Sequence, residues 1–149
     1  MRKLIHFSLV VLMLSASACQ STPEDNAGSV SRAELRNTLW ALTSLDGKAI
    51  QTGEGQRMAS LTLNAEESQA SIVTACNRGS AAYTVNGASI KFDAAMSTKM
   101  GCPEEQMQQE AAFFKTIADT VRYEIKGETL ELFNTENKLL ATFHSEYLK

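Results

Sequence analysis

Short runs of alternating apolar and polar residues, separated by turn signals, recur along most of this chain and constrain its fold more than any other feature. Such alternation is typical of strands with one buried and one solvent-exposed face. The dipeptides Asp46-Gly47 and Asn86-Gly87 suit two-residue hairpin turns, and the second predicts a turn of type I′. The expected strands are 38–42, 60–63, 70–73, 82–85, 89–92, 121–125, 129–133 and 139–143.

One segment, from Pro103 to about Thr120, has helical periodicity instead. Pro103 suits the first helical position, and Glu104 and Glu105 place negative charge at the positive end of the helix dipole. We expect the apolar stripe of this helix to be core packing. It comprises Met107, Ala111, Phe114, Ile117 or Ala118, and Val121, with Phe113 beside it.

About eight short strands and one helix cannot bury themselves as a flat sheet, because each strand has one apolar face and both edges would stay open. A strongly curled or closed antiparallel barrel, with the helix packed on an open side or end, satisfies both demands. The predicted fold class is therefore mostly β, an α+β domain with a small barrel-like sheet of about eight strands and one packed helix.

The N-terminal residues 1–18 are typical of a lipoprotein signal peptide. A basic start precedes an apolar run that is too short to span a membrane, and small residues lead to Cys19, which we expect to be lipidated. Residues 19–36 are polar and predict a flexible tether, which leaves 37–149 as one domain. Gln20 resembles the enteric sorting signal for the outer membrane, so we expect an outer-membrane anchor facing the periplasm if the source has two membranes.

Signal removal makes the chain more acidic, because 14 Lys and Arg fall to 12 while 17 Asp and Glu remain, a net charge of about −5. This balance argues against a nucleic-acid partner, since Lys and Arg neutralise the phosphates in such complexes. The expected contacts are the membrane, through the acyl chains, and an envelope protein or cell-wall component.

Cys76 and Cys102 form the available cysteine pair once Cys19 carries lipid, and an exported protein is exposed to an oxidising compartment. We expect a disulfide, which by closing a loop of about 27 residues contributes roughly 3.5 kcal/mol to stability in the chain-entropy model. The alternative is two unpaired thiols. No metal site is expected, because the mature chain retains one histidine, His144, and two cysteines do not bind zinc unaided.

No convincing catalytic set is present, and we expect a protein that is not an enzyme and needs no cofactor. His144 is the one histidine of the mature domain, and no serine lies in a Gly-x-Ser-x-Gly nucleophile elbow. Glu104 and Glu105 are adjacent on the expected helix, so their carboxylates cannot face one substrate together.

Three separated motifs resemble the META domain, the HslJ-like family of bacterial proteins. The first is Trp40 to Gly47, the second is Cys76-Asn77-Arg78 followed by Tyr83, and the third is Ser97 to Pro103 running into Glu110, Phe113 and Phe114. The resemblance implies a small antiparallel barrel-like fold, frequent occurrence in lipid-anchored envelope proteins, and links to stress tolerance or virulence. It implies no catalytic residues.

The candidate binding loop comprises Asn77, Arg78, Lys99 and Met100, next to the expected disulfide. In the structural interpretation, Asn77 bonds to local backbone and the disulfide joins this loop to the helix. In the functional one, the cysteines are redox-active or the loop binds a ligand. We expect a lipid-anchored, non-catalytic binding or stabilising protein in envelope stress tolerance. The alternative is a pilotin-like barrel that carries a lipid or small hydrophobic molecule.

Overall fold

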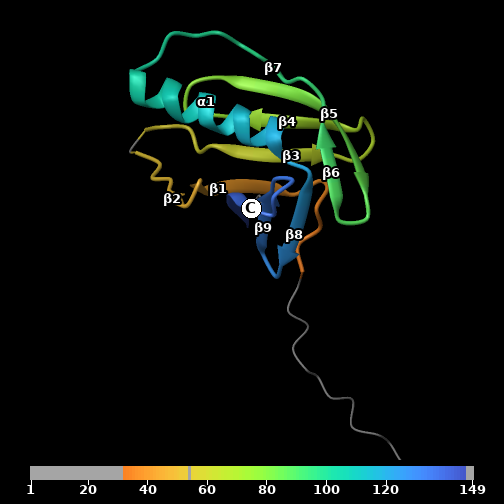
Figure 1. Cartoon of the computed structure of the whole chain (residues 1–149). Helices are drawn as coiled ribbons and strands as arrows, with labels where there is room; N and C mark the ends of the chain where they lie inside the picture. The colour runs from red at the N-terminus through yellow and green to blue at the C-terminus, as the bar shows by residue number, and fades with distance from the viewer. Residues whose placement is uncertain (1–31, 54, 147–149) are drawn as a thin grey trace, which may run out of the picture.

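The computed structural model describes residues 32–53 and 55–146, and within them eight strands form a closed antiparallel barrel with two short extra strands and one helix (Figure 1). The predicted barrel is therefore confirmed. The predicted signal peptide and the predicted lipidation site, Cys19, lie outside the described residues. The elements are β1 (Leu39–Leu45), β2 (Lys48–Ala49), β3 (Ser60–Asn64), β4 (Gln69–Val73), β5 (Arg78–Asn86), β6 (Ser89–Phe92), β7 (Met96–Ser97), α1 (Glu104–Asp119), β8 (Arg122–Lys126), β9 (Thr129–Phe133) and β10 (Leu139–Glu146).

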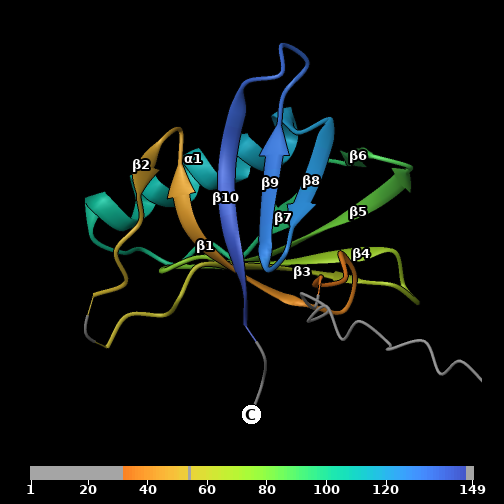
Figure 2. The ribbon, with the colours of Figure 1, turned by 90° about the horizontal axis from the view of Figure 1, so that it is seen from below.

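The barrel strands run in the order β10-β9-β8-β6-β5-β4-β3-β1, and β1 closes the ring by pairing with β10 (Figure 2). The first and last strands thus cover each other's edges, which removes the free edges of a flat sheet. The β6–β8 junction is the weakest, with one pair in register, Ser89 with Arg122. The short strands β2 and β7 pair with β1 and β5 respectively.

The hairpin turns follow the expected positions, but one differs in type. Asp46 and Gly47 both have positive φ, 47° and 76°, as a type I′ turn requires. The predicted type I′ turn at Asn86-Gly87 is wrong. Asn86 still pairs with Ser89, so the two turn residues are Gly87, with φ of 59°, and Ala88. A positive φ at the first turn residue alone fits type II′, which spares Ala88 the left-handed conformation.

Side chains fill the interior of the barrel. Buried residues alternate with more exposed ones along β4, β6 and β9. The sole tryptophan, Trp40, is fully buried, and its Nε1 donates to the carbonyl oxygen of Leu35 at 3.0 Å. Phe113 of α1 packs against Phe143 of β10, with ring centroids 5.9 Å apart. Further core residues with 0 % exposure are Leu61, Leu63, Ala70, Ile72, Leu130 and Leu132.

The folded domain begins earlier than the predicted boundary at residue 37. Ala33 and Leu35 are buried in the core cluster, and the Ala33 amide donates to the carbonyl oxygen of Gly127 at 3.0 Å. The segment 33–36 is therefore part of the domain and does not belong to a flexible tether. The sequence did not indicate that Ala33 and Leu35 belong to the core, because two isolated apolar residues among polar ones make no recognisable strand pattern.

The helix α1 has the predicted ends within one residue, but its buried face is different from the predicted stripe. Phe113, Thr116 and Ile117 are buried, whereas Met107 is 43 % exposed and Val121 is 38 % exposed. The C-terminal half of the helix lies over the barrel and its N-terminal half extends past it (Figure 1), so the early stripe positions meet no core. Among the described residues, no helix has the length and apolarity of a membrane span.

Candidate functional site

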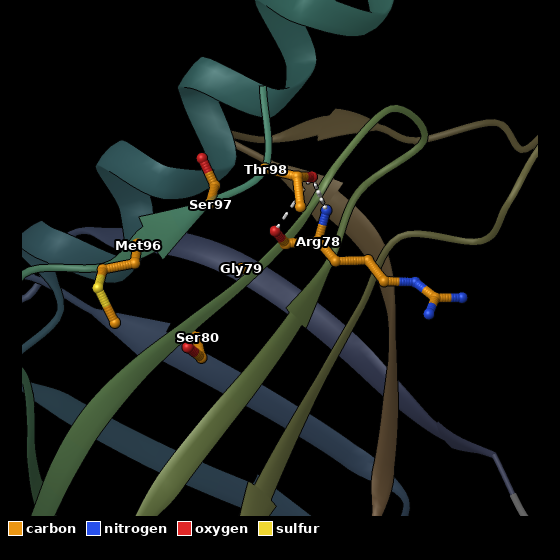
Figure 3. A pocket seen from close by; sticks show the side chains of 6 residues that line it. All are labelled: Arg78, Gly79, Ser80, Met96, Ser97 and Thr98. Atoms are coloured by element: carbon orange, nitrogen blue, oxygen red, sulfur yellow. Dashed lines mark hydrogen bonds between the residues drawn. The ribbon is translucent and has the colours of Figure 1, made fainter. Parts of the chain in front are cut away.

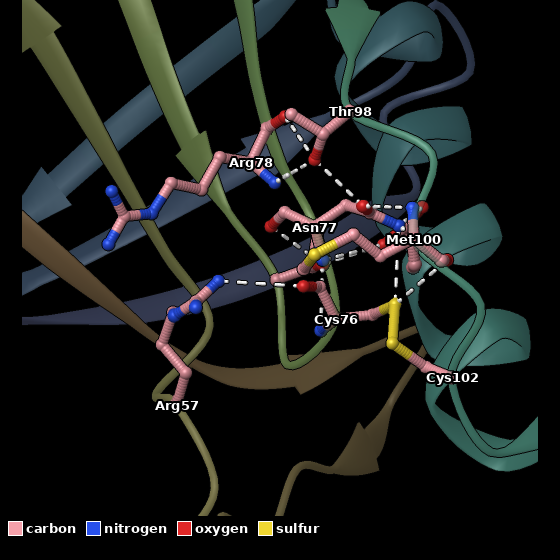
Figure 4. Close-up of a disulfide and its surroundings, with 9 residues drawn as sticks. Arg57, Cys76, Asn77, Arg78, Thr98, Met100 and Cys102 are labelled. Atoms are coloured by element: carbon pink, nitrogen blue, oxygen red, sulfur yellow. Dashed lines mark hydrogen bonds between the residues drawn. A yellow bond between two sulfur atoms is a disulfide. The ribbon is translucent and has the colours of Figure 1, made fainter.

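A disulfide joins Cys76 and Cys102, as predicted, with their Cα atoms 6.0 Å apart (Figure 4). Cys76 lies in the connection between β4 and β5, and Cys102 lies just before α1. The bond therefore ties the end of the barrel to the start of the helix. Cys76 is 2 % exposed, which is typical of a structural disulfide rather than of an accessible redox centre.

Asn77 is buried beside the disulfide, and its side chain connects two segments that are distant in sequence (Figure 4). Its Oδ1 accepts hydrogen bonds from the hydroxyl of Thr98 at 2.7 Å and from the backbone amide of Met100 at 2.9 Å. The prediction that Asn77 bonds to local backbone is therefore wrong for its carbonyl oxygen. As its partners lie more than 20 residues away, Asn77 holds the 98–100 segment against the barrel.

The carboxylate of Glu110, on α1, completes this network. Its Oε1 accepts from Asn77 Nδ2 at 3.1 Å, and its Oε2 accepts from the backbone amide of Asn77 at 3.1 Å and the hydroxyl of Thr74 at 2.7 Å. Charge-assisted hydrogen bonds of this kind are stronger than neutral ones. The β4–β5 connection is thus fixed to the helix by both a covalent bond and a carboxylate.

The neighbours of Asn77 present their side chains to solvent. Arg78 and Lys99 are exposed, and Met100 is 54 % exposed. Arg57, which precedes β3, reaches the same loop and approaches the carbonyl oxygen of Cys76 at 3.5 Å. We call the exposed side chains of Arg57, Arg78, Lys99 and Met100 the disulfide-end surface. The structure thus divides the candidate binding loop into a buried anchor, Asn77, and exposed residues available for contacts.

A shallow groove of about 380 Å³ lies beside this surface, over the paired strands β5 and β7 (Figure 3). Arg78 and Thr98 line one end of it, and Met96, which is 75 % exposed, lines the other. The remaining lining residues are Gly79, Ser80 and Ser97. Small side chains on its floor leave backbone close to the surface, which suits contact with an extended chain.

Gly79 allows the helix to pack closely on this part of the sheet. A Cβ atom at this position would lie 2.7 Å from the carbonyl oxygen of Met96 and 2.7 Å from Cζ of Phe114. Both distances are below van der Waals contact, and the first involves backbone. Any side chain at residue 79 must therefore push β7 or α1 away from β5.

The substitution Gly79→Ala is expected to lower the free energy of unfolding by about 1–3 kcal/mol, the usual cost of overpacking. Urea denaturation followed by tryptophan fluorescence measures this change. The matched control is Gly101→Ala, where a Cβ meets nothing within 4 Å. Equal stability of the two variants would contradict the close packing described here.

The other candidates from the sequence are not assembled into a site. His144 is exposed and lies 3.7 Å from Glu128, and Glu104 and Glu105 belong to the first turn of α1. Among the described residues, no three His, Cys, Asp or Glu side chains gather in a way that could hold a metal ion. The strongest perturbations of pKa belong to surface pairs. A hydrogen bond from Lys138 lowers the pKa of Asp46, and the same bond raises that of Lys138.

Sequence reasoning missed the roles of Thr74, Glu110, Arg57 and Gly79. Glu110 belongs to the third motif, but nothing local connects it with Asn77, 33 residues away. Arg57 stands in a polar segment without strand or helix periodicity. A buried asparagine and a helical glutamate at such a separation give no periodic signal in the sequence. The hydrogen bond between Asn77 and Glu110 is therefore seen only in the folded chain.

The fold, together with the β4–β5 connection that the disulfide joins to the helix, defines a class of small closed β-barrel domains with one helix and a structural disulfide. The META domain family model matches residues 33–147, and the chain belongs to this family. The start of the match agrees with the burial of Ala33.

Two solved structures share the fold. The first is an NMR structure of a protein from Burkholderia xenovorans, with 22 % sequence identity, a TM-score of 0.62, and coverage of 76 % of this chain and 85 % of that one. The second is an NMR structure of a protein with 16 % identity, a TM-score of 0.58, and coverage of 74 % and 91 %. At these identities the likeness concerns the fold alone. Among curated proteins, none matches the sequence significantly.

Proposed function

We propose that this META-domain protein is a lipid-anchored component of the cell envelope with a non-catalytic binding role, which supports tolerance of envelope stress. In this proposal Cys19 carries the acyl chains, and the disulfide-end surface contacts another envelope component. The observation that carries the proposal is the disulfide end itself. Its exposed cations and methionine surround the β4–β5 connection, which the Cys76–Cys102 bond and Glu110 hold against α1. Such preorganisation lowers the entropic cost of binding.

The position of this surface suits an anchored protein. The segment that precedes β1 begins beside the β8–β9 turn, since the Ala33 amide donates to the carbonyl oxygen of Gly127, whereas the start of α1 lies on the far side of the barrel (Figures 1 and 2). A chain anchored through Cys19 enters the domain at the first end. The disulfide-end surface is then free to meet a partner away from the protein's own attachment point.

The packing of the barrel favours surface binding over the carrier alternative. A carrier needs internal space for a lipid tail, and here Trp40, Phe143 and the surrounding leucines fill the interior at 0 % exposure. A barrel of eight strands is just wide enough for its own side chains to fill. The groove over β5 and β7 lies on the outer surface and is open to solvent.

Cross-linking in intact envelopes tests this surface. A photoreactive amino acid replaces Lys99 in the acylated protein, and the matched control replaces the exposed Glu136 in the β9–β10 turn. We expect a specific adduct from position 99 and none from position 136, identified by mass spectrometry. Adducts of equal yield at both positions, or none at position 99, would contradict the proposed surface.

The anchor is tested separately with the variant Cys19→Ala, which cannot be acylated. We expect this form to fold but to fail in restoring envelope stress tolerance to a deletion strain, because it is no longer held at the membrane. Restoration by the wild-type chain is the control, with protein levels matched by immunoblot. Full restoration by Cys19→Ala would show that tethering is dispensable.

A further inference from the structure

We propose that the disulfide-end surface recognises carboxylate groups on an acidic peptide segment of its partner, through Arg57 and Arg78. This inference rests on the proposed binding function and names the chemistry of the partner. The two guanidinium groups are 21 residues apart in sequence. The fold brings them to the disulfide loop, where the Arg57 guanidinium reaches the carbonyl oxygen of Cys76 and the Arg78 side chain extends away from α1 (Figure 4).

The register of three strands explains this juxtaposition. Ser60 of β3 pairs with Val73 of β4, and Val73 pairs with Arg78 of β5, so one row of the sheet ends at Arg78. Arg57 stands three residues before Ser60, the first residue of β3, and therefore lies beyond the same end of the sheet as the β4–β5 connection. Its Nη1 approaches the carbonyl oxygen of Cys76 at 3.5 Å, which places its side chain over the disulfide loop.

The two guanidinium groups are not neutralised by any carboxylate of the described residues, whereas Lys115, Lys126 and Lys138 each have an acidic partner. Glu110 joins the same loop, but its oxygens accept bonds from Thr74 and Asn77. Both arginines are exposed. A guanidinium presents a planar fork of donors that matches a carboxylate with two parallel hydrogen bonds. Two such forks at the disulfide end form a receptor for the carboxylates of one segment.

The net charge and the groove favour a short acidic peptide over an extended polyanion. The chain is acidic overall, with 17 Asp and Glu against 14 Lys and Arg, and its field opposes a long anionic polymer or membrane surface. A local pair of arginines still attracts a segment with a few carboxylates. The groove beside β7 starts at Arg78 and offers the exposed Met96 as an apolar contact for the same segment.

Fluorescence anisotropy with the full acylated chain in detergent micelles tests the proposal. The probe is a fluorescein-labelled eight-residue peptide of alternating glutamate and leucine. We expect the double variant Arg57→Gln/Arg78→Gln to weaken its binding by at least about tenfold, since each lost bidentate contact is charge-assisted. The matched control, Arg32→Gln/Lys91→Gln, changes net charge equally at exposed cations elsewhere and is expected to bind like the wild type.

Three outcomes of the binding measurements would overturn the proposal: no binding of the peptide, equal weakening by both double variants, or binding of phosphatidylglycerol vesicles in place of the peptide. Unchanged near-UV circular dichroism checks that the variants fold. The cross-linking residue at position 99 separates this inference from the proposed function. An adduct that persists undiminished in Arg57→Gln/Arg78→Gln overturns carboxylate recognition alone, whereas the absence of any adduct in the wild type overturns the binding surface itself.

Discussion

Replacing both Cys76 and Cys102 with serine is expected to lower the free energy of unfolding by about 3.5 kcal/mol, because the cross-link spans 26 residues and restricts the unfolded chain. Typical domains have stabilities of about 5–15 kcal/mol, so the loss is a large fraction of the total. Urea denaturation followed by the fluorescence of the buried Trp40 measures it.

The wild-type chain in excess dithiothreitol is the control for this experiment, and it is expected to match the double serine variant. Agreement between the two separates loss of the covalent bond from the effect of the new hydroxyl groups. A loss below about 1 kcal/mol would mean that the Asn77 network holds the loop without help from the disulfide.

The substitution Asn77→Ala is expected to cost about 3 kcal/mol of stability. It removes the hydrogen bonds to Thr98, Met100 and the Oε1 atom of Glu110, and it leaves the Met100 amide and the Glu110 oxygen without this partner in a partly buried place. Unsatisfied buried groups cost about 1–3 kcal/mol each, and more where a charge is involved. Denaturation in urea measures this change, with Asn86→Ala at the exposed end of β5 as the control, expected within about 0.5 kcal/mol of the wild type.

A double-mutant cycle with Glu110→Ala tests whether the two residues act as one unit. Residues that share a hydrogen-bond network are expected to show a coupling free energy of about 0.5–3 kcal/mol. Strict additivity of Asn77→Ala and Glu110→Ala would contradict the network. Loss of cross-linking from position 99 in Asn77→Ala would further connect this buried network to the proposed surface, because Asn77 positions the neighbouring Met100 backbone.

Local patterns predicted the elements of this fold well. Alternation with a period of two placed the barrel strands, and 89–92 and 129–133 match β6 and β9 at both ends. The helix was predicted within one residue at each end, since its start and stop signals lie in its own sequence. The disulfide followed from counting cysteines, and its pairing needed no knowledge of the fold.

Features that depend on how elements meet were predicted less well. The hairpin after β5 differs in turn type, because strand pairing between Asn86 and Ser89 selects the turn residues. The buried face of α1 differs from the periodic stripe, since only the C-terminal half of the helix overlies the barrel. The start of the domain was placed too late, because Ala33 is bound to the domain by a hydrogen bond to Gly127, a residue 94 positions away.

By itself, the sequence determined the strand and helix content, the cysteine pair and the acidic charge, because each depends on local periodicity or composition. Barrel closure by β1 and β10, the Asn77–Glu110 network and the meeting of Arg57 with Arg78 were decided by the tertiary structure. These features join residues that are far apart in sequence, and strand register and curvature, which arise when the whole sheet folds, set the distances between them.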